Sequence, residues 1–199
     1  NVLRPGWNAP GAASKAMPFD ISIGEPLGGY AIVDAAIGIL ELSFEELSFE
    51  TASKLVRSPF IAGAETEFAA RARLDARLRE KLGSMVSLPK LIGLLEGCPL
   101  LRAVLEKLFL KSKEKTATRS PHGWARHFTA LLEAAGFSGG RAPDPVEYQA
   151  RAKFNEVLGD FARIGLVTRE ISSNQALHRL RRICADTLFQ PETPEAPIE

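Results

Sequence analysis

Apolar residues recur at helical spacing along most of this chain. The clearest case is residues 145–163, whose apolar positions follow the spacing of one helix face. These positions are Val146, Ala150, Phe154, Val157, Leu158 and Phe161. Asp144 precedes the segment, Pro145 opens it, and Glu147 stands where it completes a capping box. The pattern predicts a helix over 145–163.

Two further segments have recognisable ends. Ser120 and Pro121 open an apolar stripe over 121–135, and Gly136 follows where a left-handed helix cap is expected. Ser172 with Gln175 predicts a second capping box, at the start of a helix that reaches residue 188. Each segment is therefore predicted to be a helix bounded by its own capping residues.

The rest of the pattern is helical as well. Five more helices are predicted, over residues 29–42, 48–57, 64–82, 88–96 and 99–110. Residues 18–27 have the composition of an extended segment, and no strand pair is predicted. Eight helical segments favour an all-α, bundle-like fold.

The length of 199 residues allows one domain with a small appendage. We expect an irregular N-terminal lead over 1–17, a helical domain over 18–188 and a Pro-rich acidic linker over 189–199. The chain has no initiating Met, and its last residues run into an apolar position. It is therefore expected to be a segment of a longer protein.

Composition excludes several classes of protein. An apolar fraction of 45% excludes charge-driven disorder, and no apolar run approaches the roughly 18 residues of a membrane span. Cys98 and Cys184 are too few for a disulfide scaffold, and apolar neighbours surround both. No targeting signal is visible at the start of the chain. The prediction is a cytoplasmic protein without a membrane partner.

Charge is distributed unevenly along the chain. Residues 71–119 hold twelve basic residues against five acidic ones, a balance of +7, whereas residues 1–50 have a balance of −5. Arg73, Arg77 and Lys81 recur every four residues on one predicted helix, as a phosphate-binding ridge requires. The candidate phosphate contacts are Arg73 and Arg77, followed by Arg71, Arg79 and Lys81.

A second interpretation of this ridge stays open. Asp75 and Glu80 interrupt it, and Asp75 with Arg79 has the spacing of an ion pair on a helix. On the residues alone, a solvated charged face is favoured over a phosphate-binding ridge.

No motif in the sequence predicts a catalytic, cofactor or metal site. Ser138 lies in a G-x-S-x-G pattern, but a hydrolase nucleophile needs a strand before this motif, and a helix is predicted there. His122 and His127 are about 140° apart around a helix, so they do not share a zinc-binding face. The chain has no Gly-Lys-Ser/Thr phosphate loop. ATP binding by this chain alone is not expected.

Six short segments occur in an order that resembles a known family. They are residues 19–27 (FDISIGEPL), 57–65 (RSPFIAGAE), 71–78 (RARLDARL), 124–128 (WARHF), 147–149 (EYQ) and 189–194 (FQPETP). The set resembles one internal stretch of long bacterial proteins described as probable DNA repair proteins, which are similar to the AddB type of helicase-nuclease subunit. The resemblance runs from about residue 18 to the end of the chain.

The resemblance implies a place for this chain in a larger protein. In that family a superfamily 1 helicase-like body precedes a C-terminal nuclease of the PD-(D/E)xK type. This chain would be the helical insertion of the second helicase-like half, comparable to the 2B region of UvrD-like helicases. ATP and Mg²⁺ would then be cofactors of the parent protein, and none would be bound by this chain. No matched motif is catalytic in the family.

Together these observations predict a non-catalytic accessory domain of a helicase-nuclease-like DNA repair protein, acting in double-strand break repair or recombination. It would support the parent's handling of DNA through backbone contacts. The alternative is a protein-interaction scaffold that docks a partner helicase subunit or neighbouring domains without touching DNA. A third hypothesis, an independent hydrolase that uses Ser138, depends on the motif rejected above.

Overall fold

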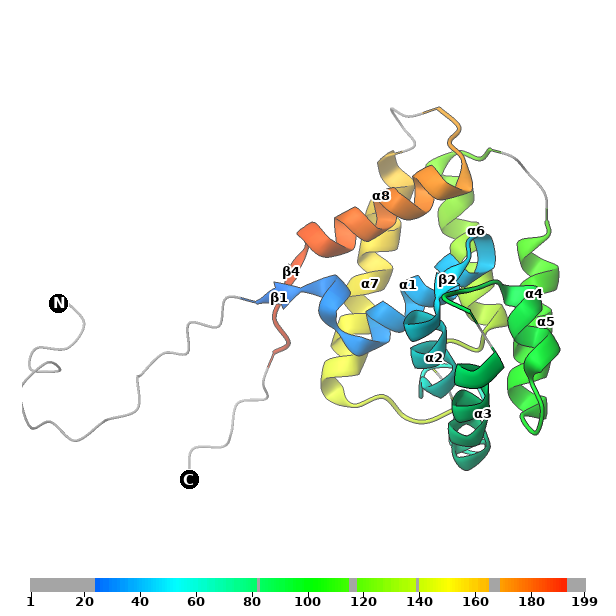
Figure 1. Ribbon diagram of the computed structural model, residues 1–199. Coiled ribbons are helices and arrows are strands. Elements are labelled where there is room, and N and C mark those ends of the chain that lie inside the picture. The colour runs from blue at the N-terminus through cyan, green and yellow to red at the C-terminus, as the bar shows by residue number, and fades with distance from the viewer. Residues whose placement is uncertain (1–23, 82, 115–117, 139, 165–168, 193–199) are drawn as a thin grey trace, which may run out of the picture.

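The computed structural model describes residues 24–81, 83–114, 118–138, 140–164 and 169–192, and within them it is mainly helical (Figure 1). The eight α helices are α1 (Ala31–Phe44), α2 (Phe49–Arg57), α3 (Phe68–Lys81), α4 (Leu88–Leu94), α5 (Pro99–Ser112), α6 (Pro121–Ala134), α7 (Pro145–Arg163) and α8 (Ser173–Asp186). A short 3-10 helix, η1 (Leu27–Gly29), precedes α1. The predicted all-α, bundle-like class is confirmed.

Three helix ends are formed by the predicted residues, whereas α8 ends at Asp186, two residues before the predicted 188. Both capping boxes are present, Asp144 with Glu147 at α7 and Ser172 with Gln175 at α8. Gly136 follows α6 with a positive φ of 58°, the left-handed conformation expected of it. Helix α3 begins at Phe68, four residues later than predicted, because residues 64–67 form turns.

Two short antiparallel strand pairs contradict the expectation that the chain has none. Strand β1 (Glu25–Pro26) pairs with β4 (Leu188–Phe189), and β2 (Leu47–Ser48) pairs with β3 (Met85–Val86). Each strand has only two residues, which is too short for the alternating pattern that reveals strands in a sequence. The expectation that no strands pair was therefore wrong, because strands this short leave no pattern in the sequence.

Helix α1 runs through the middle of the helical assembly. It contacts α2, α5, α6, α7 and α8, and nine of its residues are buried. In Figure 1, α8 crosses α7 on one side of α1, while α4 and α5 lie on the opposite side and α3 at the lower end. A single apolar core therefore connects all of these helices. Helix α3 contributes Leu74 and Leu78 to it from its inward face.

The fold extends past the predicted start of the linker at residue 189. Phe189 belongs to β4, and its ring lies 5.1 Å from that of Tyr30, whose hydroxyl donates to the Phe189 carbonyl. The side chain of Gln149 on α7 exchanges two hydrogen bonds with the backbone of Glu192, at 2.7 and 3.1 Å. Residues 189–192 are thus attached to the helical domain. The predicted lead over 1–17 and the remainder of the predicted linker, 193–199, lie outside the described residues.

Candidate nucleic-acid interface

The five basic side chains predicted to contact phosphate all lie on α3, but they do not share one surface. Consecutive residues of a helix are about 100° apart, so a run of five positions spreads around the axis. Arg71 is in the interior, Arg73 and Arg77 line one pocket, and Arg79 lies beside Asp75. Lys81 is exposed at the end of α3. The structure therefore brings together only the pair Arg73 and Arg77.

Arg71 is buried and has partners within the protein. Its side chain is 2% exposed, its Nε lies 3.3 Å from Glu67 Oε2, and its Nη2 donates to the Ala62 carbonyl at 2.6 Å. Burial, which disfavours the charged form, lowers the pKa of Arg71. The structure thus gives Arg71 a buried, paired position that does not favour the predicted phosphate contact, because the inward face of α3 passes through it.

The partner of Arg71, Glu67, fixes the position of α5. Its two carboxylate oxygens accept hydrogen bonds from the backbone amides of Leu100 at 2.6 Å and Leu101 at 3.0 Å. These amides belong to the first turn of α5, where a helix has unpaired donors and favours a negative charge. The Glu67–Arg71 pair thus holds α3 against α5 from the inside.

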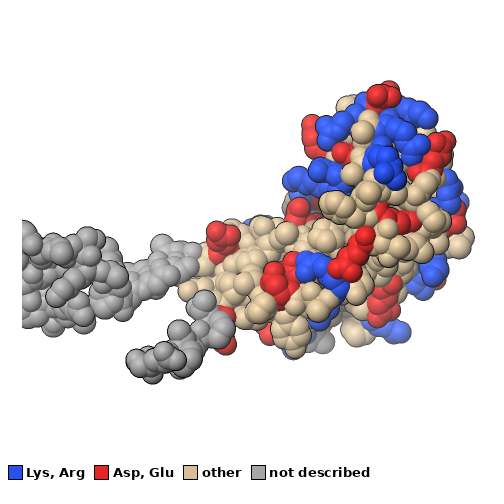
Figure 2. Space-filling model, turned by 90° about the horizontal axis from the view of Figure 1, so that it is seen from below, with Lys and Arg blue, Asp and Glu red and all other residues tan. Residues whose placement is uncertain are grey.

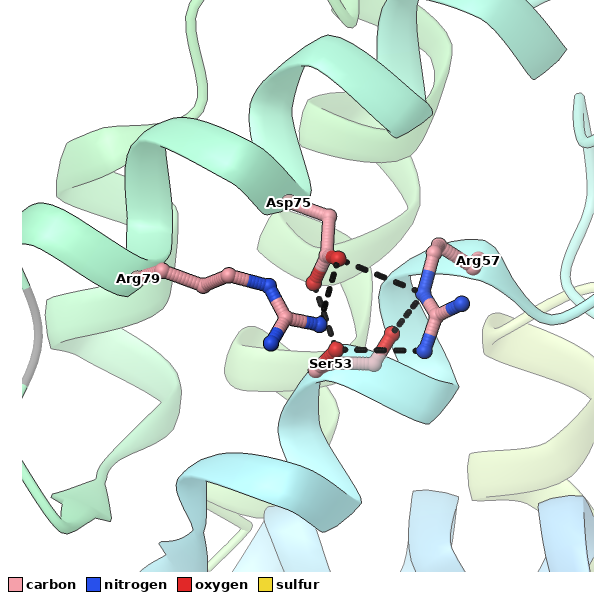
Figure 3. Close-up of polar contacts among 4 residues, drawn as sticks. All are labelled: Ser53, Arg57, Asp75 and Arg79. Atoms are coloured by element: carbon pink, nitrogen blue, oxygen red, sulfur yellow. Dashed lines mark hydrogen bonds and ion pairs between the residues drawn. The ribbon is translucent and has the colours of Figure 1, made fainter.

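A second polar cluster joins α2 to α3 (Figure 3). Asp75 of α3 is buried, and Ser53 of α2 donates its hydroxyl to Oδ1 of that carboxylate at 2.5 Å. Arg57 and Arg79 approach the other oxygen from opposite sides, with nitrogens 3.4 and 3.2 Å away. Arg57 also donates to the hydroxyl and the backbone carbonyl of Ser53. One buried carboxylate therefore orients two arginines, one from each helix.

These two arginines remain accessible from outside. The side chain of Arg57 is 49% exposed and that of Arg79 is 58% exposed. The guanidinium of Arg79 also lies 5.5 Å from the centre of the Phe49 ring, a cation–π distance. Each guanidinium is held by protein partners at one edge and open at another, an arrangement suited to binding an oxyanion.

The pair Arg73 and Arg77 lines a shallow pocket of about 460 Å³. The other lining residues are small or acidic: Ala70, Ala76, Glu96 and Gly97. Arg77 is occupied in part, since it donates to the Glu96 carboxylate at 2.8 Å and to the Glu96 carbonyl at 2.7 Å. Arg73 is exposed, and within the described ranges no ion pair holds it. A phosphate can thus approach Arg73 directly and Arg77 from one side.

The surface around α3 carries both signs of charge. Figure 2 shows the molecule from the side on which α3 lies, and Lys and Arg side chains gather at one end of that view. Asp and Glu side chains lie among them. The net positive balance of residues 71–119 is therefore spread over a mixed surface, and its basic side chains outside the described ion pairs include Lys90 on α4 and Lys107 on α5 as well as Arg73 on α3.

Two residues of this region were not found from the sequence. Arg57 reaches α3 only because the turns through 58–67 place α2 beside it, and no local pattern predicts that contact. Phe68 was expected inside a longer helix but is the first residue of α3 and is 75% exposed. The one sign in the sequence that Phe68 could have a role at the surface was its place as an aromatic residue in a segment rich in Ala and Arg.

Ser138 lacks the surroundings of a hydrolase nucleophile. It lies after α6 with a φ of 77°, and its hydroxyl accepts a hydrogen bond from Arg151 at 3.0 Å. No histidine among the described residues is hydrogen-bonded to it, and a serine nucleophile needs such a base. The local structure agrees with the interpretation of this motif as a helix end and turn.

The two histidines of α6 occupy different environments. His127 is buried beside Phe44 and Trp124, and burial lowers its pKa. His122 is exposed at the start of the helix. Across the described ranges, no group of three or more His, Cys, Asp or Glu side chains is placed to hold a metal ion.

None of the described helices is both long and apolar enough to cross a membrane.

No protein-family model matches this chain, and no similar curated protein or solved structure was found.

Proposed function

We propose that this chain is a non-catalytic helical accessory domain of a helicase-nuclease-like DNA repair protein, where it contacts the backbone of duplex or forked DNA. The observation that carries the proposal is the pair Arg73 and Arg77 in one pocket on α3, which the small residues Ala70, Ala76 and Gly97 also line. Small lining residues leave room for a sugar-phosphate backbone to approach the two guanidinium groups. Backbone contacts of this kind position DNA without reading its sequence.

The antiparallel pair β1–β4 supports the accessory role. It brings the first described residues of the domain beside the last, with Glu25 opposite Phe189. A domain inserted between two segments of a host needs its two ends close together. This arrangement suits the insertion implied by the resemblance to AddB-type subunits, and in such a parent ATP and Mg²⁺ would be bound by other segments.

The compartment and the partners follow from the same proposal. DNA, the other domains of the parent and a helicase partner subunit are the proposed partners. Cys98 and Cys184 are both buried as free thiols, which suits the reducing cytoplasm in which a bacterial DNA repair protein works.

The proposal is tested by removing the two arginines together. We expect Arg73→Ala with Arg77→Ala to weaken binding of labelled forked and duplex DNA, because two phosphate contacts are lost. The slope of log affinity against log salt concentration should become shallower by up to about 1.8, at roughly 0.9 per phosphate contact. Fluorescence anisotropy at several salt concentrations measures both quantities.

A matched control removes the same charge elsewhere. Arg163 and Arg182 are each 77% exposed and lie on α7 and α8. Replacing both by Ala should leave the affinity and the salt slope close to those of the unmodified chain. Equal affinities and slopes for all three proteins would contradict the proposed phosphate contacts.

One observation favours the alternative function, a scaffold that docks a partner helicase subunit or neighbouring domains without touching DNA. Leu110 and Leu188 are 70% and 62% exposed, at the end of α5 and on β4. Exposed leucines gain stability when a partner covers them. Absence of binding to forked and duplex DNA even at low salt would favour this scaffold.

A further inference from the structure

A pocket on another face of α3 offers a place for a nucleobase. It has a volume of about 430 Å³, within the roughly 300–1,000 Å³ typical of small-molecule sites. Its walls are formed by Pro59, Ala64, Phe68 and Ala72, with Arg57, Glu65 and Arg71 completing the lining. Most of this wall is apolar, and the aromatic ring in it is the most exposed large hydrophobic side chain described, at 75%.

This pocket is separate from the pocket of Arg73 and Arg77. Phe68, Ala72, Asp75 and Arg79 follow one another at steps of four, three and four residues, so they form one stripe of α3. Arg73 is five positions after Phe68, which places it about 140° around the helix. Substitutions on the two faces can therefore be tested independently.

The polar cluster of Asp75 provides cations beside the pocket. Arg57 lines the pocket and is held in place by Asp75 and Ser53, and Arg79 is held on the other side of the same carboxylate (Figure 3). Asp75 is seven residues along α3 from Phe68, or about 10 Å at 1.5 Å per residue. An apolar pocket with an exposed ring thus lies beside two oriented guanidinium groups, that of Arg79 on the same stripe and that of Arg57 on α2.

We propose that this pocket binds one nucleobase of single-stranded DNA, stacked on Phe68, with the adjoining phosphates at Arg57 and Arg79. A nucleotide presents a flat apolar base and an anionic backbone side by side, which matches an exposed ring with a pair of cations near it. Among the charged residues that line the pocket, Glu65 repels an anionic backbone and Arg57 attracts it, so the backbone is expected beside Arg57. The inference rests on the proposed DNA-binding function and adds the single-stranded part of a fork to it.

The test is titration of the chain into fluorescein-labelled oligothymidine, with labelled duplex in parallel. Phe68→Ala should lower the affinity for oligothymidine about five- to hundredfold, the range found when one base–aromatic stack is removed. Phe68→Leu keeps apolar bulk without the ring, so its affinity should also fall. Because Phe68 is mostly exposed, both variants should retain the helical circular dichroism of the unmodified chain.

A matched control removes another exposed aromatic ring. Tyr148 on α7 is 58% exposed, and Tyr148→Ala should leave the affinity for oligothymidine unchanged. Equal affinities for Phe68→Ala and the unmodified chain would overturn the inference. Binding of an acidic, tryptophan-containing peptide in place of oligothymidine, lost in Phe68→Ala, would also overturn it and identify a protein partner.

The two proposals fail in different ways. If the unmodified chain binds duplex but not oligothymidine, the nucleobase pocket is overturned, and Arg73→Ala with Arg77→Ala still decides the duplex contacts. If it binds neither DNA, both proposals are overturned. Binding of oligothymidine that Phe68→Ala weakens, while Arg73→Ala with Arg77→Ala weakens duplex binding, supports both.

Discussion

Gly136 shows how one residue without a side chain ends α6. Its amide donates to the Glu133 carbonyl and the amide of Phe137 donates to the Leu132 carbonyl, each at 2.9 Å. These two bonds are the Schellman motif, which needs a left-handed residue at this position. A Cβ atom on Gly136 would lie 2.5 Å from the Cβ of Ala62, so the close approach of this neighbour excludes a side chain as well.

Gly136→Ala is therefore expected to lower the free energy of unfolding by at least about 1–2 kcal/mol, the cost of left-handed backbone for a residue with a side chain. Urea denaturation followed by circular dichroism measures the loss. Gly159→Ala is the control, since Gly159 lies inside α7 and a methyl group there would meet nothing within 4 Å. That change should be neutral or stabilise the helix by up to about 1 kcal/mol; an equal loss in both variants would contradict the argument.

His127 predicts a pH dependence with a definite sign. Burial, assisted by the charge of Arg119, lowers its pKa below the ordinary value of 6.5, so the unfolded chain binds the proton more readily than the folded one. Its contribution to stability is complete above pH 6.5 and is lost as the pH falls below that value. Between pH 7.5 and 5.5, the unmodified chain should lose more unfolding free energy than His127→Gln does. Equal losses in the two proteins would show that His127 does not cause the change.

At the scale of the elements, α2 and α3 are joined by charge as well as by apolar contact. Asp75 is buried, while its partners Arg57 and Arg79 are half-exposed. Burial removes the hydration of this carboxylate, and the two cations and the Ser53 hydroxyl stabilise it instead. The register of one helix on the other is therefore fixed by a polar group as well as by apolar packing.

Asp75→Asn tests this joint between the helices. The amide keeps the size of the side chain but removes the charge that orients both arginines, so we expect a loss of about 1–3 kcal/mol in unfolding free energy. Asp160→Asn is a matched control, because Asp160 pairs with Arg163 at the surface, where both side chains are mostly exposed. Exposed pairs contribute only about 0–1 kcal/mol. Thermal or urea unfolding that ranks the two variants equally would contradict a special role for Asp75.

At the scale of the whole molecule, helices were predictable where their ends carry a chemical signal. Asp144 with Glu147 and Ser172 with Gln175 mark two starts, and Gly136 marks an end, as the structure confirms. The beginning of α3 was less predictable, because Ala64 and its neighbours suit a helix but are needed for the turns that follow α2. Local preference was overridden there by the packing of the chain.

The candidate site was predictable only in part, for a related reason. The spacing of Arg73 and Arg77 placed them on one face, and they do line one pocket. The same spacing gave no sign that Arg71 is buried, because an arginine pattern does not reveal which face a helix turns inward. Arg71 pairs with Glu67, whose carboxylate accepts hydrogen bonds from amides of α5. These amides lie more than thirty positions after Glu67 in the sequence. Contacts of that range are set by the fold alone.

The pairing of β1 with β4 also has an entropic consequence for any host that carries this domain as an insertion. Closing a long flexible loop restricts the host's unfolded chain, and the restriction grows with the logarithm of the loop length. Once the domain has folded, its two ends are separated by about the 5 Å between paired strands. For the host chain, the folded domain then joins two points that are only the distance between two paired strands apart. Folding of the insertion before its host would therefore remove most of the loop-closure entropy that the host would otherwise lose.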